Sequence, residues 1–206
     1  MIHSKFETIL NYHELLLSQN TDQVPIDSPN YDELASAPSL HYMYKLEAES
    51  MVFLMRRVLD SLVQLTYLLT NYKDFERTKV IKYNAIGQFI KVTDPTKDIE
   101  KIIIGDERDY KSDHTGFFSV INDLFNSFKH CLMHDESNLL IGTELPTITS
   151  FQAKYNNHNE IIIHHNYNAY HLMMGFQDNV ERILFNQREY VNQKKTRLAP
   201  LAINDV

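Results

Sequence analysis

The chain has a single cysteine, Cys131, among its 206 residues. One thiol cannot form a disulfide within the chain, and without a CxxC pair there is no cysteine-rich zinc module to consider. This usage is typical of proteins in a reducing compartment, so the sequence predicts a cytoplasmic protein.

Glycine is also scarce, with 5 residues spread along the chain. A loop that cradles phosphate needs clustered glycines, because their backbone amides must approach the ligand closely. The motifs GxxxxGK[ST], GxGxxG and GxSxG are all absent. The sequence therefore supports neither a P-loop nor a Rossmann site, and we expect no cofactor.

Long apolar runs and a general positive charge are missing as well. The longest apolar stretches, such as residues 51–55, are too short to span a bilayer, and residues 1–7 lack the layout of a signal peptide. The net charge of −7 provides no global basic field for nucleic acid. We therefore expect no membrane partner.

One local group of basic residues lies in a segment predicted to be helical. Its members are Lys73, Arg77, Lys79, Lys82 and Lys91. Exposed charges of this kind usually form a solvated helix face. The alternative is a surface that contacts an RNA backbone, for which the candidate residues are Lys73, Arg77, Lys79 and Lys82.

Apolar residues recur at helical spacing along most of the chain. The predicted helices cover residues 2–18, 39–71, 74–92, 117–135 and 169–193. The second of these has apolar positions on more than one side, which predicts a central helix with neighbours on several faces. A short helical turn is expected at residues 28–33, because Ser28 can cap it and Pro29 can take its first position.

One β-hairpin is predicted, from β-prone residues 147–155 and 160–167 around a turn-rich linker. Residues 99–104 form a brief apolar run that fits a short helix or a strand equally well. The predicted fold class is mainly α, an up-and-down helical bundle with a small β-hairpin inserted before the last long helix. We expect one helical domain over residues 1–206, with a basic tail at residues 194–206.

The predicted helix at residues 117–135 is the most informative segment, because it has two distinct stripes. A core-facing stripe steps by three or four residues through Phe117, Ile121, Leu124, Phe128 and Cys131. A polar row consists of Asn122, Asn126, His130 and His134. Asparagine costs roughly half a kcal/mol against alanine in a helix. The polar row is therefore either a plain solvent-facing stripe or a set of groups suited to hydrogen bonding and proton chemistry.

Within this helix, the stretch Phe125-Asn126-Ser127-Phe128-Lys129-His130 resembles the RN…H helix of HEPN-like proteins. The resemblance implies a helical bundle from a toxin or defence system that cleaves RNA without metal across a homodimer interface. Asn126 and His130 match the polar residue and the histidine of that motif, but Phe125 stands where the motif has arginine. Lys129 is the nearest cation, and it lacks the planar fork with which arginine holds a phosphate. This departure is typical of a degenerate member of the family.

A formal match to the arginine-to-histidine spacing lies elsewhere, at Arg108 and His114. These residues fall in a segment predicted to be a polar loop, whereas the family motif lies on a helix. Short motifs of this kind also arise by chance. Arg108 and His114 are therefore a second candidate catalytic pair, after Asn126, Lys129 and His130.

Histidine spacing raises the question of a metal site. His130 and His134 are four residues apart, as in zinc-binding helices, but Cys131 replaces the glutamate of a HExxH motif. A third ligand would have to be Asp135, His164, His165 or His171. His164 and His165 are neighbours on a predicted strand, so one should be exposed and the other packed. We predict no metal site, and His130 and His134 are the candidate ligands if a metal binds.

Two functional hypotheses follow from these observations. The first is a HEPN-like, RNA-associated protein of a toxin or defence system, catalytically degenerate and homodimeric. If it cleaved RNA, it would be a metal-independent endoribonuclease in which Asn126 orients His130 for general acid–base chemistry. The second hypothesis is a non-catalytic module that binds a protein partner, in which the asparagines and histidines form an internal polar network.

Overall fold

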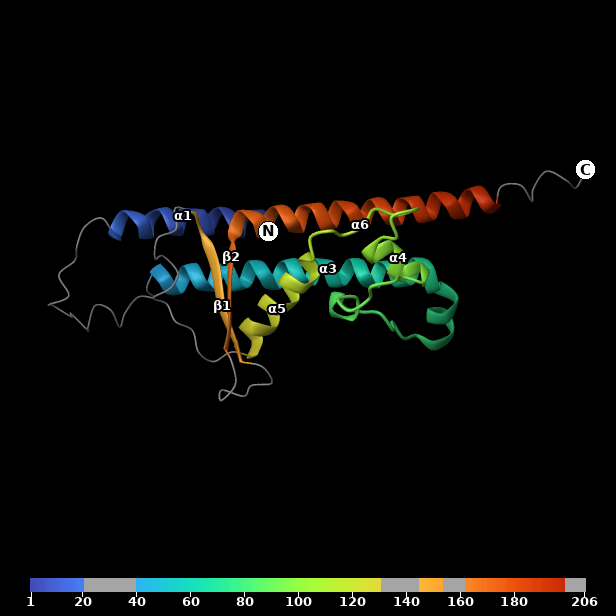
Figure 1. Cartoon of the computed structure of the whole chain (residues 1–206), viewed down its shortest axis with the longest axis horizontal. Coiled ribbons are helices and arrows are strands. Elements are labelled where there is room, and N and C mark those ends of the chain that lie inside the picture. The colour runs from blue at the N-terminus through green and yellow to red at the C-terminus, as the bar shows by residue number, and fades with distance from the viewer. Residues whose placement is uncertain (21–39, 131–144, 154–161, 199–206) are drawn as a thin grey trace, which may run out of the picture. The chain divides into compact units, whose positions relative to one another are not determined.

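The computed structural model describes residues 1–20, 40–130, 145–153 and 162–198 (Figure 1). Their elements in chain order are α1 (Ile2–Asn20), α3 (Leu40–Thr78), the 3-10 helix η1 (Ile86–Gln88), α4 (Asp98–Ile104), α5 (Phe117–His130), β1 (Thr147–Ala153), β2 (Ile162–Asn168) and α6 (Ala169–Leu198). The described chain is thus mainly helical, with one antiparallel hairpin directly before the last long helix. The predicted fold class is confirmed in these respects. The short turn predicted at residues 28–33 lies outside the described residues.

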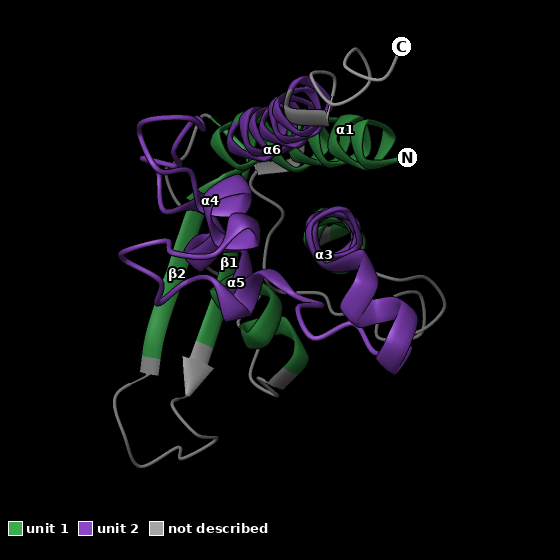
Figure 2. Cartoon of the chain, turned by 90° about the vertical axis from the view of Figure 1, so that its right-hand side faces the viewer, with its two compact units in different colours: residues 1–55, 123–174 green, residues 56–122, 175–206 purple. Residues whose placement is uncertain are grey.

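The chain divides into two compact units (Figure 2). Unit 1 comprises residues 1–55 and 123–174, and unit 2 comprises residues 56–122 and 175–206. The helices α3, α5 and α6 each contribute residues to both units. The expectation of a single domain stays a prediction. None of the helices in the described residues has an apolar stretch long enough to cross a membrane.

In unit 1, α1 follows the predicted helix and continues two residues beyond its expected end. Its buried positions step by three or four residues through Phe6, Ile9, His13 and Leu16. The ring of Phe6 meets that of Tyr170 edge-on, with centroids 5.0 Å apart. Apolar spacing of three or four residues thus gives this helix one buried face.

The hairpin of unit 1 has the two predicted strands, over Thr147–Ala153 and Ile162–Asn168, whereas residues 154–155 and 160–161, which were also predicted to be extended, lie outside the described part. β1 pairs with β2 from Thr147 opposite Asn168 to Ala153 opposite Ile162. His165 is buried and His164 is exposed, which confirms the prediction that these neighbours differ in environment. Burial lowers the pKa of His165, with Asp123 opposing this effect, so its imidazole is favoured in the neutral form.

Helix α3 has 39 residues and carries a kink at Asn71, where φ is −130° and ψ is 32°. The sequence predicted a helix end at this residue, and the structure instead continues in a further helical segment to Thr78. The described elements bury one face of α3, which includes Tyr44, Met51, Met55, Leu59 and Val63. The expectation that its other apolar positions are also covered is wrong for four residues, which are between 38% and 44% exposed: Leu46, Phe53, Leu65 and Leu69.

The helix predicted at residues 74–92 is wrong beyond Thr78. Lys79 adopts a left-handed φ of 56°, and its N–H bonds to the carbonyl of Phe75, which ends the helix. The next short element is η1, where the amide of Ile86 donates to Asp60 rather than to a helical carbonyl. The apolar spacing that suggested a long helix instead reflects Ile86 and Phe89, which are buried around this turn.

The ambiguous run at residues 99–104 is helical and belongs to α4. The carboxylate of Glu100 accepts hydrogen bonds from the backbone N–H groups of Thr96 and Lys97, which caps the start of this helix. Burial acts to raise the pKa of Glu100, but hydrogen bonds from Lys97 and Thr96 outweigh it and hold the pKa below its usual value. The isoleucines of α4 then face the core of unit 2 as Ile99, Ile102 and Ile103.

Helix α6 extends further than expected. The sequence predicted an end near Gln193 and a basic tail from Lys194, whereas helical structure continues to Leu198. The prediction of a non-helical tail is therefore wrong for residues 194–198, and residues 199–206 lie outside the described part. Lys194 lies with its ammonium 5.1 Å from the centre of the Tyr190 ring, which places it against this helix.

Candidate functional site

The polar row of α5 begins with a side chain that is bonded inside unit 2. The Oδ1 atom of Asn122 accepts a hydrogen bond of 2.7 Å from Nη1 of Arg56, on α3. Arg56 is only 7% exposed, and its Nε lies 3.0 Å from both carboxylate oxygens of Asp60. The side chain of Asn122 thus takes part in a hydrogen-bond network with Arg56 and Asp60.

This Arg56 cluster, consisting of Arg56, Asp60 and Asn122, also fixes the segment around η1. Asp60 accepts the amide N–H of Ile86 at 2.8 Å. A Cβ atom added to Gly87 would lie 3.1 Å from Oδ1 of Asn122, so glycine permits this close approach. The cluster therefore ties α3, α5 and η1 together, which is a structural role.

The remaining α5 candidates lie in unit 1. Phe125, at the position of the family's arginine, packs against Phe53 with ring centroids 4.8 Å apart. Asn126 is half-buried and Lys129 is exposed. The side chain of His130 and the whole of His134 lie outside the described residues. The structure therefore does not test these two as catalytic or metal-binding residues.

The second candidate pair is brought together by the fold. Arg108 and His114 both line one surface cavity of unit 2, with a volume of about 750 Å³. Its other lining residues are Glu107, Asp109, Tyr110, Lys111, Ser112 and Phe185. The pair lies in a loop between α4 and α5, as the sequence predicted, and not on a helix.

We call residues 105–114 the anchored loop, because buried polar side chains of α6 hold its backbone. The side chain of Asn186 is fully buried and donates to the carbonyls of Ile102 and Lys111, at 3.0 and 2.9 Å. Its Oδ1 accepts the amide N–H of Lys111 at 2.9 Å. The guanidinium of Arg182 donates to the carbonyl of Ile103 at 2.8 Å and to that of Lys111 at 3.3 Å.

The loop is also held by its own residues. Oδ1 of Asp106 accepts backbone N–H groups from Arg108, Asp109 and Tyr110 at 2.9 to 3.2 Å. Gly105 has a φ of 96°, and a Cβ atom there would lie 2.3 Å from Cα of Ser112, so only glycine fits. Glu107 takes a left-handed φ of 59°, which is costly for a residue other than glycine. The loop thus has one well-defined conformation.

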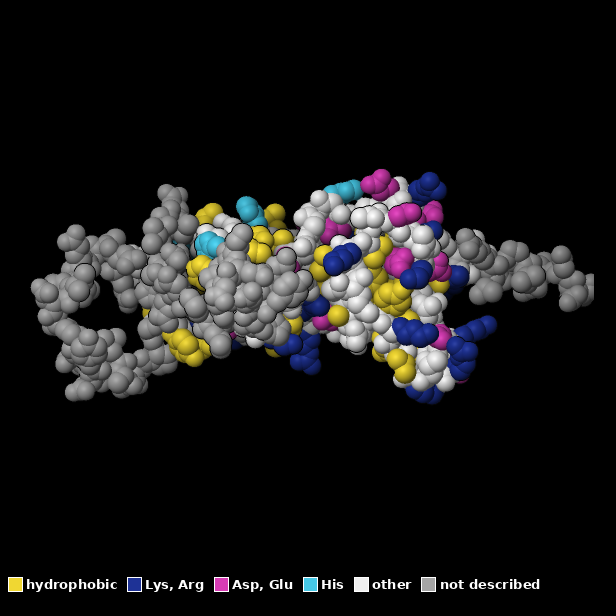
Figure 3. Space-filling view, turned by 60° about the horizontal axis from the view of Figure 1, so that its bottom comes forward, with side chains coloured by type: hydrophobic (Ala, Val, Ile, Leu, Met, Phe, Trp, Pro, Cys, Tyr) yellow, Lys and Arg dark blue, Asp and Glu magenta, His cyan; other side chains and the backbone are white. Residues whose placement is uncertain are grey.

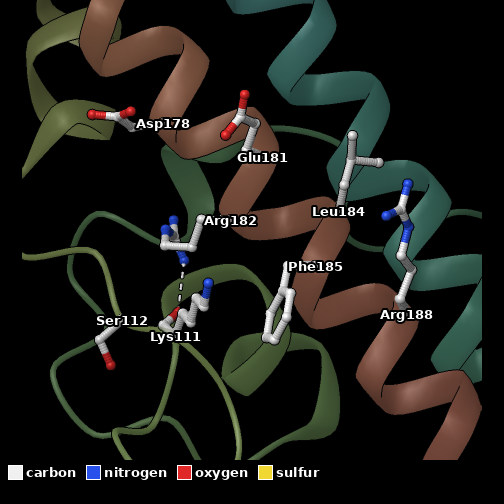
Figure 4. A pocket seen from close by; sticks show the side chains of 8 residues that line it. All are labelled: Lys111, Ser112, Asp178, Glu181, Arg182, Leu184, Phe185 and Arg188. Carbon is white, nitrogen blue, oxygen red and sulfur yellow. Dashed lines mark hydrogen bonds between the residues drawn. The ribbon is translucent and has the colours of Figure 1, made fainter.

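A second cavity, of about 510 Å³, adjoins the first and shares Lys111, Ser112 and Phe185 with it (Figure 4). It is also lined by Asp178, Glu181, Arg182, Leu184 and Arg188. The ammonium of Lys111 lies 4.1 Å from the centre of the Phe185 ring, a cation–π contact. Burial lowers the pKa of Arg182, and its Nε finds no hydrogen-bond partner among the described residues.

The basic residues predicted as an RNA surface do not share one helix. Arg77 and Lys82 both pair with Asp74, at 3.0 and 2.6 Å. Hydrogen bonds from Lys82, Tyr67 and Arg77 lower the pKa of Asp74 to about 2.

Lys73 and Lys79, the other two members of this group, are exposed. On the face seen in Figure 3, several basic side chains lie close together, with an acidic side chain among them. Two of these four basic residues are thus paired with Asp74, whereas Arg108 and Lys111 of the anchored loop line a cavity.

Sequence reasoning missed the residues that build this site from α6. Asn179, Arg182, Asn186 and Gln193 recur at helical spacing on a helix otherwise noted for its apolar stripe. Polar side chains in register on one face were the signal available. Within the described ranges, no three His, Cys, Asp or Glu side chains gather closely enough to hold a metal ion.

Comparison of the chain with protein-family models, with curated proteins and with solved structures finds no match.

Proposed function

We propose that this protein is a HEPN-like helical protein that associates with RNA through the anchored loop. The observation that supports this most strongly is the shared cavity of Arg108 and His114, which also contains Lys111. Two cations and an imidazole that line one cavity suit the phosphodiester backbone. The exposed ring of Phe185 offers a surface on which a base can stack.

The anchoring of the loop supports this proposal. Surface loops that carry function are often held by a rigid scaffold. Here, the side chains of Asn186 and Arg182, on α6, donate hydrogen bonds to the carbonyl of Lys111. The cations of the loop are then presented without a large loss of backbone entropy when a ligand binds.

Acidic residues in the same cavity limit the expected affinity. Glu107 and Asp109 lie in its lining, and the whole chain carries a net charge of −7. We therefore expect a dissociation constant on the order of 10 to 100 µM at physiological salt. With Arg108 and Lys111 neutralising two phosphates of a single strand, the logarithm of the association constant should fall with the logarithm of salt at a slope of about −1.4.

The binding test uses a fluorescein-labelled single-stranded RNA and measures anisotropy with the full chain. The double variant Arg108→Gln and Lys111→Gln should weaken binding about tenfold and reduce the salt slope by about 1.4. The control is Arg57→Gln, which removes an exposed arginine of α3 that does not line the cavity. Equal losses in both variants, or no loss in either, would refute the proposed contact surface.

We further propose that α5 does not cleave RNA. Phe125 fills the arginine position of the motif with a packed aromatic ring, and Asn122 is engaged by Arg56. Purified protein should therefore leave single-stranded and structured RNA intact. Cleavage that is lost in His130→Ala or Asn126→Ala would overturn this part of the proposal. Cleavage that is lost in His114→Ala would instead place catalysis at the anchored loop.

The second candidate function is a non-catalytic module that binds a protein partner. It is supported by the bond from Arg56 to Asn122, which makes the first member of the polar row part of an internal network. A module of this kind, or a homodimer, would show its assembly by light scattering after size exclusion. A strictly monomeric chain at about 100 µM would count against the homodimer.

A further inference from the structure

An exposed apolar strip lies between α3 and α6 in unit 2. Leu65 and Leu69 of α3 are 44% and 38% exposed and are separated by one helical turn. Leu69 also lines a surface cavity of about 420 Å³ together with Leu184 and Val191 of α6. We call this surface the α3–α6 groove, defined by Leu65, Leu69, Leu184, Gln187, Arg188, Val191 and Asn192.

Hydrogen bonds between α3 and α6 hold the groove together. Gln187 of α6 is 5% exposed, and its Nε2 donates to Oγ1 of Thr66 at 2.9 Å and to the carbonyl of Leu62 at 3.3 Å. These bonds join α3 to α6 through Gln187, which is itself one of the residues that line the groove. A preformed groove can therefore accept a side chain without first rearranging.

Helix propensity does not account for the leucines in this position. Most other exposed positions of α3 in unit 2 carry polar residues, such as Arg57, Ser61 and Glu76, with Tyr72 as an exception. Lysine or glutamate would form the helix almost equally well at Leu65 and Leu69 and would avoid exposing apolar surface to water. Single exposed leucines are common, but here Leu69 lines a cavity and Leu65 lies one helical turn before it, which indicates a binding surface.

The charges around the groove indicate what it binds. Arg188 is exposed and lines the cavity, and none of the cavity's six lining residues is acidic. Lys195 is exposed two helical turns further along α6. These cations contrast with the net charge of −7 of the whole chain.

We propose that the α3–α6 groove binds an acidic amphipathic helix of a protein partner. Such a helix would insert leucine-type side chains, spaced by three or four residues, over Leu69 and Val191. A carboxylate on its flank would pair with Arg188 and fix its direction. The groove shares no lining residue with the cavity of Arg108 and His114, although Leu184 and Arg188 also line the second cavity that adjoins it.

The test uses two fluorescein-labelled helical peptides with the same leucine spacing, one with glutamate flanks and the other with lysine flanks. Fluorescence anisotropy with the full chain should show at least about tenfold preference for the glutamate peptide. Leu69→Glu should weaken its binding about tenfold. Arg188→Glu should reverse the preference between the two peptides, which a merely misfolded variant would not do.

The matched control is Leu46→Glu, which replaces a leucine of the same helix that is 40% exposed in unit 1. Binding of the glutamate peptide should be unchanged in this variant. The proposal is overturned if both peptides bind equally, if neither binds, or if Leu46→Glu has the effect of Leu69→Glu. A dimer that dissociates in Leu69→Glu would also overturn it, because the groove would then be occupied by a second copy of this chain.

Discussion

The polar row of α5 and the anchored loop use their polar groups in opposite ways. On α5, the row starts with Asn122, whose side chain is tied to the buried Arg56. In the anchored loop, the buried hydrogen bonds go to the backbone of Lys111, and the side chains of Arg108 and His114 remain exposed around a cavity. A polar pattern on a helix can thus be structural, whereas a loop held by buried groups leaves its own side chains available for a ligand.

The largest effect is expected from Gly105→Ala in the anchored loop. A Cβ atom at this position would lie 2.3 Å from Cα of Ser112. Alanine would also have to adopt the φ of 96° that glycine has here. We expect a loss of about 4 kcal/mol in the free energy of unfolding, measured by urea denaturation. The matched control is Gly116→Ala, where φ is 64° but nothing lies within 4 Å, and the loss should be about 1 kcal/mol. Similar losses of unfolding free energy in the two variants would show that the anchored loop can shift to accommodate a Cβ atom at residue 105.

A somewhat smaller effect is expected from Arg56→Met at the Arg56 cluster. Loss of the guanidinium leaves Asp60 and Asn122 without their main partner, which should cost about 3 kcal/mol of stability in urea. RNA affinity, measured under conditions where the variant is folded, should not change. A folded Arg56→Met protein with weakened RNA binding would contradict a purely structural cluster.

Asn186→Ala should lower both stability and RNA affinity, which separates the loop from the Arg56 cluster. The change leaves the carbonyls of Ile102 and Lys111 without the hydrogen bonds that Asn186 supplies, at an expected cost of about 2 kcal/mol. The freed loop should also bind RNA several-fold more weakly. Asn192→Ala, at an exposed position of the same helix, is the control for both measurements. Unchanged affinity in Asn186→Ala would show that anchoring is unimportant for binding.

The smallest effects are expected from changes of pH, to which the β-hairpin and the anchored loop should respond in different ranges. Burial lowers the pKa of His165, so the unfolded chain binds the proton more tightly and stability falls as the pH drops below about 6.5. Burial acts to raise the pKa of Asp106, but backbone N–H groups in the anchored loop outweigh it and lower this pKa. The stability from Asp106 is therefore present above about pH 4 and is lost as the pH falls through the lower, folded value.

Thermal melts between pH 7 and pH 3 would separate these two contributions. His165→Phe should remove the part of the pH dependence between pH 7 and pH 5, and Asp106→Asn should remove a part below pH 4. If the melting temperatures of the wild type and both variants depended on pH in the same way, the lowered pKa values of His165 and Asp106 would be contradicted.

Much of the fold follows from periodicity, as α1, α5 and the hairpin illustrate. The sequence could not show where the helix after Asn71 ends, because the stop depends on a left-handed φ at Lys79, a residue type that helices ordinarily accept. Nor could it show that the amide of Ile86 bonds to Asp60, which is distant in sequence. The exposure of Leu65 and Leu69 was also hidden, because an apolar residue has the same pattern whether or not a neighbour covers it.

The candidate site was less predictable than the fold. Spacing alone identified Arg108 and His114 but could not show that they share a cavity, since this depends on α6 holding the loop. Arg56 lies 66 residues before Asn122 in sequence, so no local motif could associate the two. Contacts between distant segments therefore decide which polar residues are structural and which face a ligand.

The most direct test of the proposed RNA surface is hydrogen–deuterium exchange of the full chain with and without a single-stranded RNA. Exchange reports protection along the backbone, so it can distinguish the anchored loop from α5 in one experiment. We predict RNA-dependent protection concentrated in residues 106–114, with no change over residues 117–130. Protection over residues 117–130 with an unchanged anchored loop would contradict the account.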